Sequence, residues 1–138
     1  MQPSISVITL AVDDLERALV FYRDGLGWPT AGIVGTKYEY GAVVFFDINP
    51  GLKLALWPRA SLARDTGLPL AKPTSSNMLL SHNVAERDQV DAVFAQALAA
   101  GASQVKAPQT VFWGGYAGYF SDPDGHLWEV VFNPAWPS

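Results

Sequence analysis

An internal repeat is the feature that most constrains how this chain folds. Two glycines and a phenylalanine recur with one spacing in both halves of the sequence: Gly27, Phe46 and Gly51 and, 74 residues later, Gly101, Phe120 and Gly125. Self-similarity at a fixed period is the signature of a repeated supersecondary unit. A chain of 138 residues has the length of one ordinary domain. We therefore expect a single domain, 1–138, built from two similar modules.

Each half predicts the same order of elements. An apolar strand comes first, at 6–12 and again at 78–84, and an amphipathic helix that ends at Gly27 or Gly101 follows it. Strand-rich segments then complete each half, at about 32–40, 42–48 and 52–57, and at about 103–107, 110–120 and 127–132. The sequence therefore predicts an α+β fold of two tandem βαβββ modules.

The expected boundaries follow from the distribution of proline, glycine and serine. Module 1 is expected at about 4–58 and module 2 at about 78–134, with a linker at about 59–77 that holds one short helical turn around 60–66. A helix on one face of a four-stranded sheet leaves the other face uncovered. Two such sheets side by side are expected to form a curved mixed sheet with a cleft for a small ligand.

Composition excludes several classes of function. The chain has no Cys, which excludes disulfides, cysteine nucleophiles and cysteine zinc sites. Its net charge of −4 offers no basic surface for nucleic acid, so we expect no nucleic-acid partner. No apolar run is long enough for a membrane helix, and the first residues do not resemble a secretory signal. We therefore expect a cytoplasmic protein with no membrane partner.

Three segments carry a resemblance to a known family: Thr9 to Leu15, Phe21 to Trp28 and Asp122 to Glu129. They resemble the vicinal oxygen chelate (VOC) superfamily, which holds glyoxalase I, extradiol dioxygenases, fosfomycin-resistance enzymes and bleomycin-resistance proteins. The resemblance implies the glyoxalase/bleomycin-resistance fold and a homodimer. The resemblance does not identify a reaction, because proteins with this architecture include enzymes of several reaction types and proteins that only bind a ligand.

Metal-using members of that superfamily place a His or Gln on the first strand of each half and a Glu on the last strand. Counting along the repeat, the four matching positions are Val7, Ala55, Leu79 and Glu129. One carboxylate cannot hold a catalytic ion, because such sites need about three protein ligands. His82 should face the helix and His126 should lie in a turn. We therefore expect no metal site and no cofactor.

The candidate ligand-binding residues lie on the strand faces that no helix covers and in a glycine-rich aromatic segment. Period-two alternation places Thr9 and Ser81 on the open faces of the first strands, and Trp57 on that of a last strand. Aromatic side chains between glycines offer flat faces and polar tips to a ligand. The aromatic candidates in that segment are Trp113, Tyr116 and Tyr119. Together they predict a cleft that binds a small apolar or aromatic molecule.

Two alternatives remain open from the sequence. The chain is an enzyme of the lyase, isomerase or dioxygenase type if Glu129 acts as a general base without metal, or if a divalent metal is bound at a non-standard site. Apolar surroundings would suit Glu129 to that role, whereas a hydrogen bond to a Tyr hydroxyl or a Lys would make it structural. The chain is a scaffold if dimerisation is its main interaction.

Overall fold

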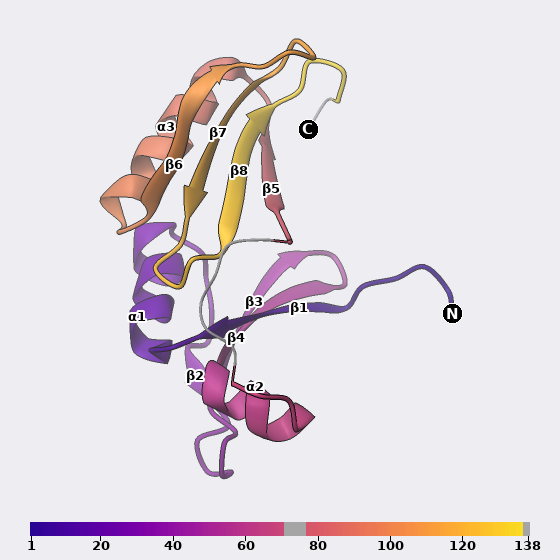
Figure 1. Ribbon diagram of the computed structural model, residues 1–138, viewed down its shortest axis with the longest axis vertical. Helices are drawn as coiled ribbons and strands as arrows, with labels where there is room; N and C mark the ends of the chain where they lie inside the picture. The colour runs from indigo at the N-terminus through magenta and orange to yellow at the C-terminus, as the bar shows by residue number, and fades with distance from the viewer. Residues whose placement is uncertain (71–76, 137–138) are drawn as a thin grey trace. The chain divides into compact units, whose positions relative to one another are not determined.

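The computed structural model describes residues 1–70 and 77–136, which form two compact units, Met1–Pro73 and Thr74–Ser138 (Figure 1). We call them module 1 and module 2. The expected linker contains a helix, α2 (Arg59–Thr66), at the position of the predicted helical turn. This helix packs on module 1, whereas 71–76 lie outside the described residues.

Module 1 has the predicted βαβββ order. Strand β1 (Val7–Val12) is followed by a helical segment and then by β2 (Ile33–Val34), β3 (Val43–Asn49) and β4 (Leu52–Pro58). The sheet order is β1-β4-β3-β2, with β1 parallel to β4 and the other pairs antiparallel. Buried residues alternate along β1, which places Leu10 and Val12 beneath the helix.

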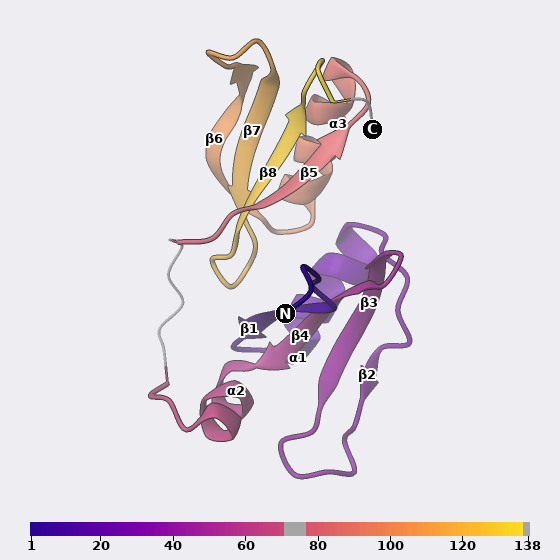
Figure 2. The same cartoon turned by 90° about the vertical axis from the view of Figure 1, so that its right-hand side faces the viewer.

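Module 2 repeats this topology. Its elements are β5 (Leu80–Val84), α3 (Arg87–Ala99), β6 (Ser103–Thr110), β7 (Tyr116–Ser121) and β8 (Leu127–Phe132). The sheet order is β5-β8-β7-β6, with β5 parallel to β8. The helix α3 lies along one face of this sheet (Figure 2). The predicted α+β class and the tandem βαβββ architecture are confirmed.

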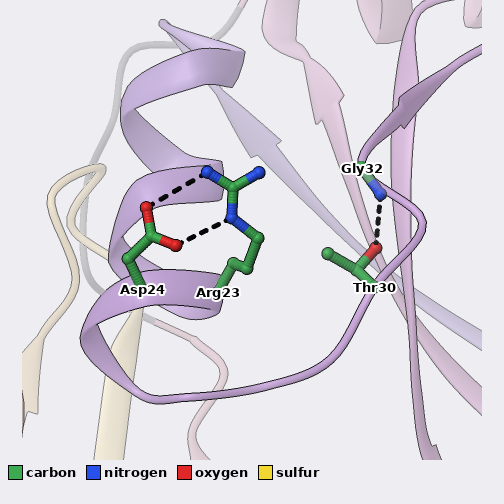
Figure 3. Close-up of polar contacts among 4 residues, drawn as sticks. All are labelled: Arg23, Asp24, Thr30 and Gly32. Atoms are coloured by element: carbon green, nitrogen blue, oxygen red, sulfur yellow. Dashed lines mark hydrogen bonds and ion pairs between the residues drawn. The ribbon is translucent and has the colours of Figure 1, made fainter.

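The first helix differs from its simple amphipathic prediction. It begins as α1 (Leu15–Leu19), which the Asp14 side chain caps, and continues as a wider π-helical turn, η1 (Val20–Gly25). The exposed Arg23–Asp24 ion pair lies on this turn (Figure 3). Beyond it, the Thr30 hydroxyl donates a hydrogen bond to the Phe45 carbonyl and accepts one from the Gly32 N–H. Thr30 thus holds the segment after the helix against β3.

Two predicted strands are shorter than expected. The strand predicted at 32–40 is reduced to Ile33–Val34, because the chain turns where Gly35 and Tyr40 have φ values of 79° and 58°. The predicted strand at 110–120 is interrupted by a turn, where Gly114 has a φ of 96°, and β7 begins only at Tyr116. These two turns were missed because their aromatic residues favour strands.

Each module has its own aromatic core beneath its helix. In module 1, Tyr22 contacts Trp28 and Phe46 at ring-centroid distances of 5.6 and 6.0 Å. In module 2, Phe120 contacts both Phe94 and Trp128 at 6.3 Å. Phe46 and Phe120 are the repeated phenylalanines, so the repeat marks equivalent core positions. None of the helices in the described residues is both long and apolar enough to cross a membrane.

Candidate functional site

Three neighbouring strands of each module place one residue each in a row on the sheet face opposite the helix. The central residue of each row lies on the last strand of the module, β4 or β8. It is paired with one residue on the first strand, β1 or β5, and with one on the preceding strand, β3 or β7. The two rows are Thr9, Ala55 and Phe45 in module 1 and Ser81, Glu129 and Tyr119 in module 2. Equivalent backbone positions therefore carry an apolar row in one module and a polar row in the other.

The polar row of module 2 is a closed hydrogen-bond network. Glu129 accepts one bond from the Ser81 hydroxyl at 2.7 Å and another, on its second oxygen, from the Tyr119 hydroxyl at 2.9 Å. Burial, and next the hydrogen bond to this carboxylate, raise the pKa of Tyr119 above its ordinary value. Tyr119 therefore keeps its proton at neutral pH and donates a hydrogen bond to Glu129, and the carboxylate is held in one orientation.

The apolar row of module 1 lies in a hollow of about 270 Å³. The hollow brings together Thr9 and Trp57, both of which the sequence placed on the open face. Its remaining lining is small or apolar: Gly41, Val43, Phe45 and Ala55. This volume is close to the lower limit for small-molecule sites, and the lining offers one side-chain hydroxyl among apolar groups.

A second hollow of about 240 Å³ lies beside the first and also has Trp57 in its wall. Its other lining residues come from the loop between β2 and β3 and from α2: Glu39, Tyr40, Ser61, Arg64 and Asp65. Sequence reasoning missed this hollow because it placed residues 38–40 on a strand and α2 in a linker. The spacing of 61, 64 and 65 at i, i+3 and i+4 was the available signal for one helix face.

The structure separates the three aromatic candidates of module 2. Tyr116 lies on the helix side of the sheet, where its hydroxyl donates to Asp91 at 2.7 Å and its ring lies under the Arg87 guanidinium at 4.2 Å. The hydrogen bond to Asp91 raises the pKa of Tyr116. Trp113 lies in the turn before β7, and its ring covers Gly115, where any Cβ would overlap it. Only Tyr119 of the three adjoins Glu129.

The residues at the superfamily's metal positions do not fit a divalent ion. Val7, Ala55 and Leu79 have no donor atoms in their side chains, and both oxygens of Glu129 accept hydrogen bonds from hydroxyl groups. Among residues 1–70 and 77–136, no group of three or more His, Asp or Glu side chains could hold a metal ion. These four positions offer one carboxylate, whereas catalytic zinc sites use about three protein ligands.

Neither histidine supplies a missing ligand at these positions. His82 is in register with the buried Val130, and desolvation lowers the pKa of its imidazole. His126 belongs to the turn before β8, where its backbone N–H donates to the Asp122 carboxylate at 2.8 Å. The two residues lie where the sequence placed them, one on the helix-facing register and one in a turn.

Comparison with known proteins decides the family. The model of the Glyoxalase/Bleomycin resistance protein/Dioxygenase superfamily matches residues 4–130. The chain belongs to this superfamily. The resemblance read from the three sequence segments is therefore confirmed. The sequence matches none of the curated proteins.

Solved structures of other superfamily members share the fold. A glyoxalase-related enzyme from Fulvimarina pelagi is 34% identical, with a TM-score of 0.85 over 98% of this chain and 91% of its own. A glyoxalase/bleomycin resistance protein/dioxygenase from Nocardioides is 24% identical, with a TM-score of 0.76 over 100% of this chain and 86% of its own. A lactoylglutathione lyase from Agrobacterium tumefaciens is 23% identical, with a TM-score of 0.69 over 99% and 98%.

Proposed function

We propose that this superfamily member binds a small apolar or aromatic molecule in the hollow of module 1 and does so without a metal. The hollow carries the proposal, because Trp57, Phe45 and Val43 offer apolar contact area around the single hydroxyl of Thr9. The floor of the hollow is Ala55, at the position that Glu129 occupies in module 2. A methyl group there leaves room for a ligand where a carboxylate would fill it.

A fluorescence titration tests this proposal. Trp57 emission should change as a small aromatic ligand fills the hollow, and Trp57→Ala should abolish both the signal and the binding. Ala55→Leu should weaken binding at least about tenfold, because a larger side chain occupies the space that the ligand needs. Trp136→Phe is the matched control, since Trp136 is exposed and lies outside the hollow. Unchanged binding in Ala55→Leu would place the ligand elsewhere.

Metal analysis tests the second part of the proposal. Protein purified without a chelator should contain no divalent metal at one ion per chain, because three of the four superfamily ligand positions have no donor atoms. Stoichiometric metal that is lost in Glu129→Gln would contradict the proposal and assign a non-standard site around this carboxylate.

The polar row of module 2 favours a second candidate function, an acid–base enzyme that uses Glu129. Ser81 and Tyr119 orient the carboxylate, and Tyr119 remains protonated beside it because its pKa is raised. Lactoylglutathione is the substrate to test, because one similar structure is named a lactoylglutathione lyase. Turnover that Glu129→Gln abolishes and Tyr119→Phe slows would support an enzyme. No turnover of this compound, with or without added divalent metal, would contradict this lyase activity.

A further inference from the structure

The second hollow indicates which chemical group the ligand carries. We infer that the ligand of this protein is an apolar or aromatic molecule with an ammonium group, the apolar body in the first hollow and the ammonium in the second. The inference deepens the proposed binding function and rests on it. It follows from the lining of the second hollow, from its charges and from a largely buried serine whose hydroxyl opens into it.

The two hollows meet at Trp57. The indole ring of this residue belongs to the wall of both, and its N–H donates a hydrogen bond to the Tyr40 carbonyl at 3.3 Å. Tyr40 lines the second hollow and the next residue, Gly41, lines the first. One molecule of two parts can therefore contact both sides of the indole.

The charges of the second hollow favour a cation. Its lining has two carboxylates, Glu39 and Asp65, against one guanidinium, that of Arg64. Arg64 lies over the Tyr40 ring at 4.2 Å, whereas no described residue forms a hydrogen bond or an ion pair with either carboxylate. Because Arg64 already covers the Tyr40 ring, the Trp57 indole is the aromatic side chain of this lining that remains for a ligand cation. One carboxylate in excess beside this indole attracts an ammonium group, through both charge and the cation–π interaction.

A largely buried serine offers a polar contact to a ligand in this hollow. Ser61 lines the second hollow and is 5% exposed. No described residue forms a hydrogen bond with its hydroxyl, and the oxygen is not one of the fully enclosed atoms, so it opens into the hollow. A ligand that fills the hollow displaces water from this oxygen and must replace the hydrogen bond that the water made. A ligand N–H group in this hollow would give the Ser61 oxygen a donor.

The walls of the second hollow are held in place by contacts within module 1. Arg59, at the start of α2, donates to the Asp13 carboxylate at 2.9 Å and to the Ala11 carbonyl at 3.2 Å, which fixes the helix to the end of β1. Tyr40 has a φ of 58°, a conformation that is unfavourable for a tyrosine. Backbone strain of this kind persists where the surroundings maintain it, and it is frequent at ligand sites. Figure 2 shows α2 and the β2–β3 loop at the same end of the sheet.

A series of three probes with one phenyl body tests the inference. The probes are 2-phenylethylamine, 2-phenylethanol and 3-phenylpropionate, which carry an ammonium, a neutral hydroxyl and a carboxylate. Calorimetric titration of the full chain should give an amine dissociation constant about tenfold below that of the alcohol, with the carboxylate weakest. The advantage of the amine should shrink as salt is added, because the carboxylates of the hollow are exposed.

Variants assign the effect to the second hollow. Glu39→Gln with Asp65→Asn should remove the advantage of the amine and leave the alcohol unchanged. Glu16→Gln with Asp88→Asn removes the same charge outside both hollows and should keep the advantage. Ser61→Ala should weaken the amine severalfold, and Trp57→Ala should abolish binding of amine and alcohol alike.

The outcomes separate the inference from the proposed function. If the alcohol or the carboxylate binds as tightly as the amine, and Trp57→Ala still abolishes binding, the ammonium assignment is wrong and the binding function stands. An amine advantage that survives Glu39→Gln with Asp65→Asn would also overturn the inference. If none of the three probes binds, both the inference and the proposed function fail.

Discussion

Two neutral hydroxyl groups hold the carboxylate of Glu129 on the open sheet face of module 2. Ser81 donates to one oxygen and Tyr119 to the other. Hydrogen bonds to an ionised acceptor are about twice as strong as those between neutral groups. The Glu129 side chain is thus restrained without an arginine or a lysine. A hydrogen bond to a Tyr hydroxyl is the structural role that the sequence offered as the alternative to a catalytic role for Glu129.

The titration of Tyr119 reports on this network. Glu129→Ala should lower the pKa of Tyr119 towards its ordinary value of about 10 without reaching it, because desolvation is the largest cause of the shift and remains. The difference in ultraviolet absorbance between each protein and its Tyr119→Phe counterpart isolates this one phenol. An unchanged pKa in Glu129→Ala would show that the hydrogen bond is absent in solution.

The same shift has a defined effect on stability. Because the folded protein holds the Tyr119 proton more tightly than the unfolded chain, the contribution of this residue is fully present below about pH 10. It is lost as the pH rises through the higher pKa of the folded state. Tyr119→Phe should therefore unfold with a weaker dependence on pH in that alkaline range.

Period-two alternation along the strands predicted the sheet face on which most of these side chains lie. Thr9, Ser81 and Glu129 lie on the faces that a period of two assigns to them, and Ala55 and Glu129 are equivalent as the repeat required. The position of Tyr116 could not be read in this way. It begins β7 after a glycine turn, so alternation could not be carried across the turn.

At the scale of elements, module 2 depends on one close approach between β6 and β7. The register shifts between Lys106 and Gln109, and the Pro108 ring lies over Gly118 at this bulge. A Cβ on Gly118 would come within 2.9 Å of the ring and 3.0 Å of the Pro108 nitrogen. Because part of the obstacle is backbone, it cannot move aside as a flexible side chain would.

Gly118→Ala should therefore destabilise the protein by about 1–3 kcal/mol, the usual cost of overpacking. Chemical denaturation followed by circular dichroism measures this loss. Pro108→Ala removes the ring, so the same substitution should cost less in that background, and a double-mutant cycle gives the coupling. Additive effects of the two changes would contradict the contact.

Two elements near the candidate site were predicted with unequal success. The helical turn expected around 60–66 corresponds to α2, whose last residue precedes Gly67 in a left-handed conformation with a φ of 76°. The strand expected over 32–40 is mostly a loop, because Gly35 and Gly41 approach one another closely. That approach is a tertiary contact between backbone segments, which strand propensity does not encode.

For the whole molecule, the repeat predicted the topology because two copies with equal spacing must build equal sheets. What the repeat could not predict is the chemistry of each copy. The hollows of module 1 depend on the β2–β3 loop and α2, and neither has an equivalent in the repeated pattern. The candidate binding residues on α2, which are Ser61, Arg64 and Asp65, accordingly emerged from the structure.

We predict that two copies of the chain associate. Val7 and Phe45 are exposed on the sheet of module 1, and Leu79 is exposed just before β5 in module 2. A second copy would remove such apolar groups from water. Sedimentation velocity at micromolar concentration should show a dimer, and Phe45→Ser should shift the equilibrium towards monomer. A monomer at concentrations of about 100 μM would contradict this prediction, because obligate homodimers persist well below that range.

The two rows differ in chemistry although their backbone positions are equivalent. A hydroxyl, a methyl and a phenyl group stand in one copy where a hydroxyl, a carboxylate and a phenol stand in the other, on matched backbone. Each module is therefore an internal control for the other. Ala55→Glu with Phe45→Tyr would give module 1 the carboxylate and the phenol of module 2 at the same backbone positions.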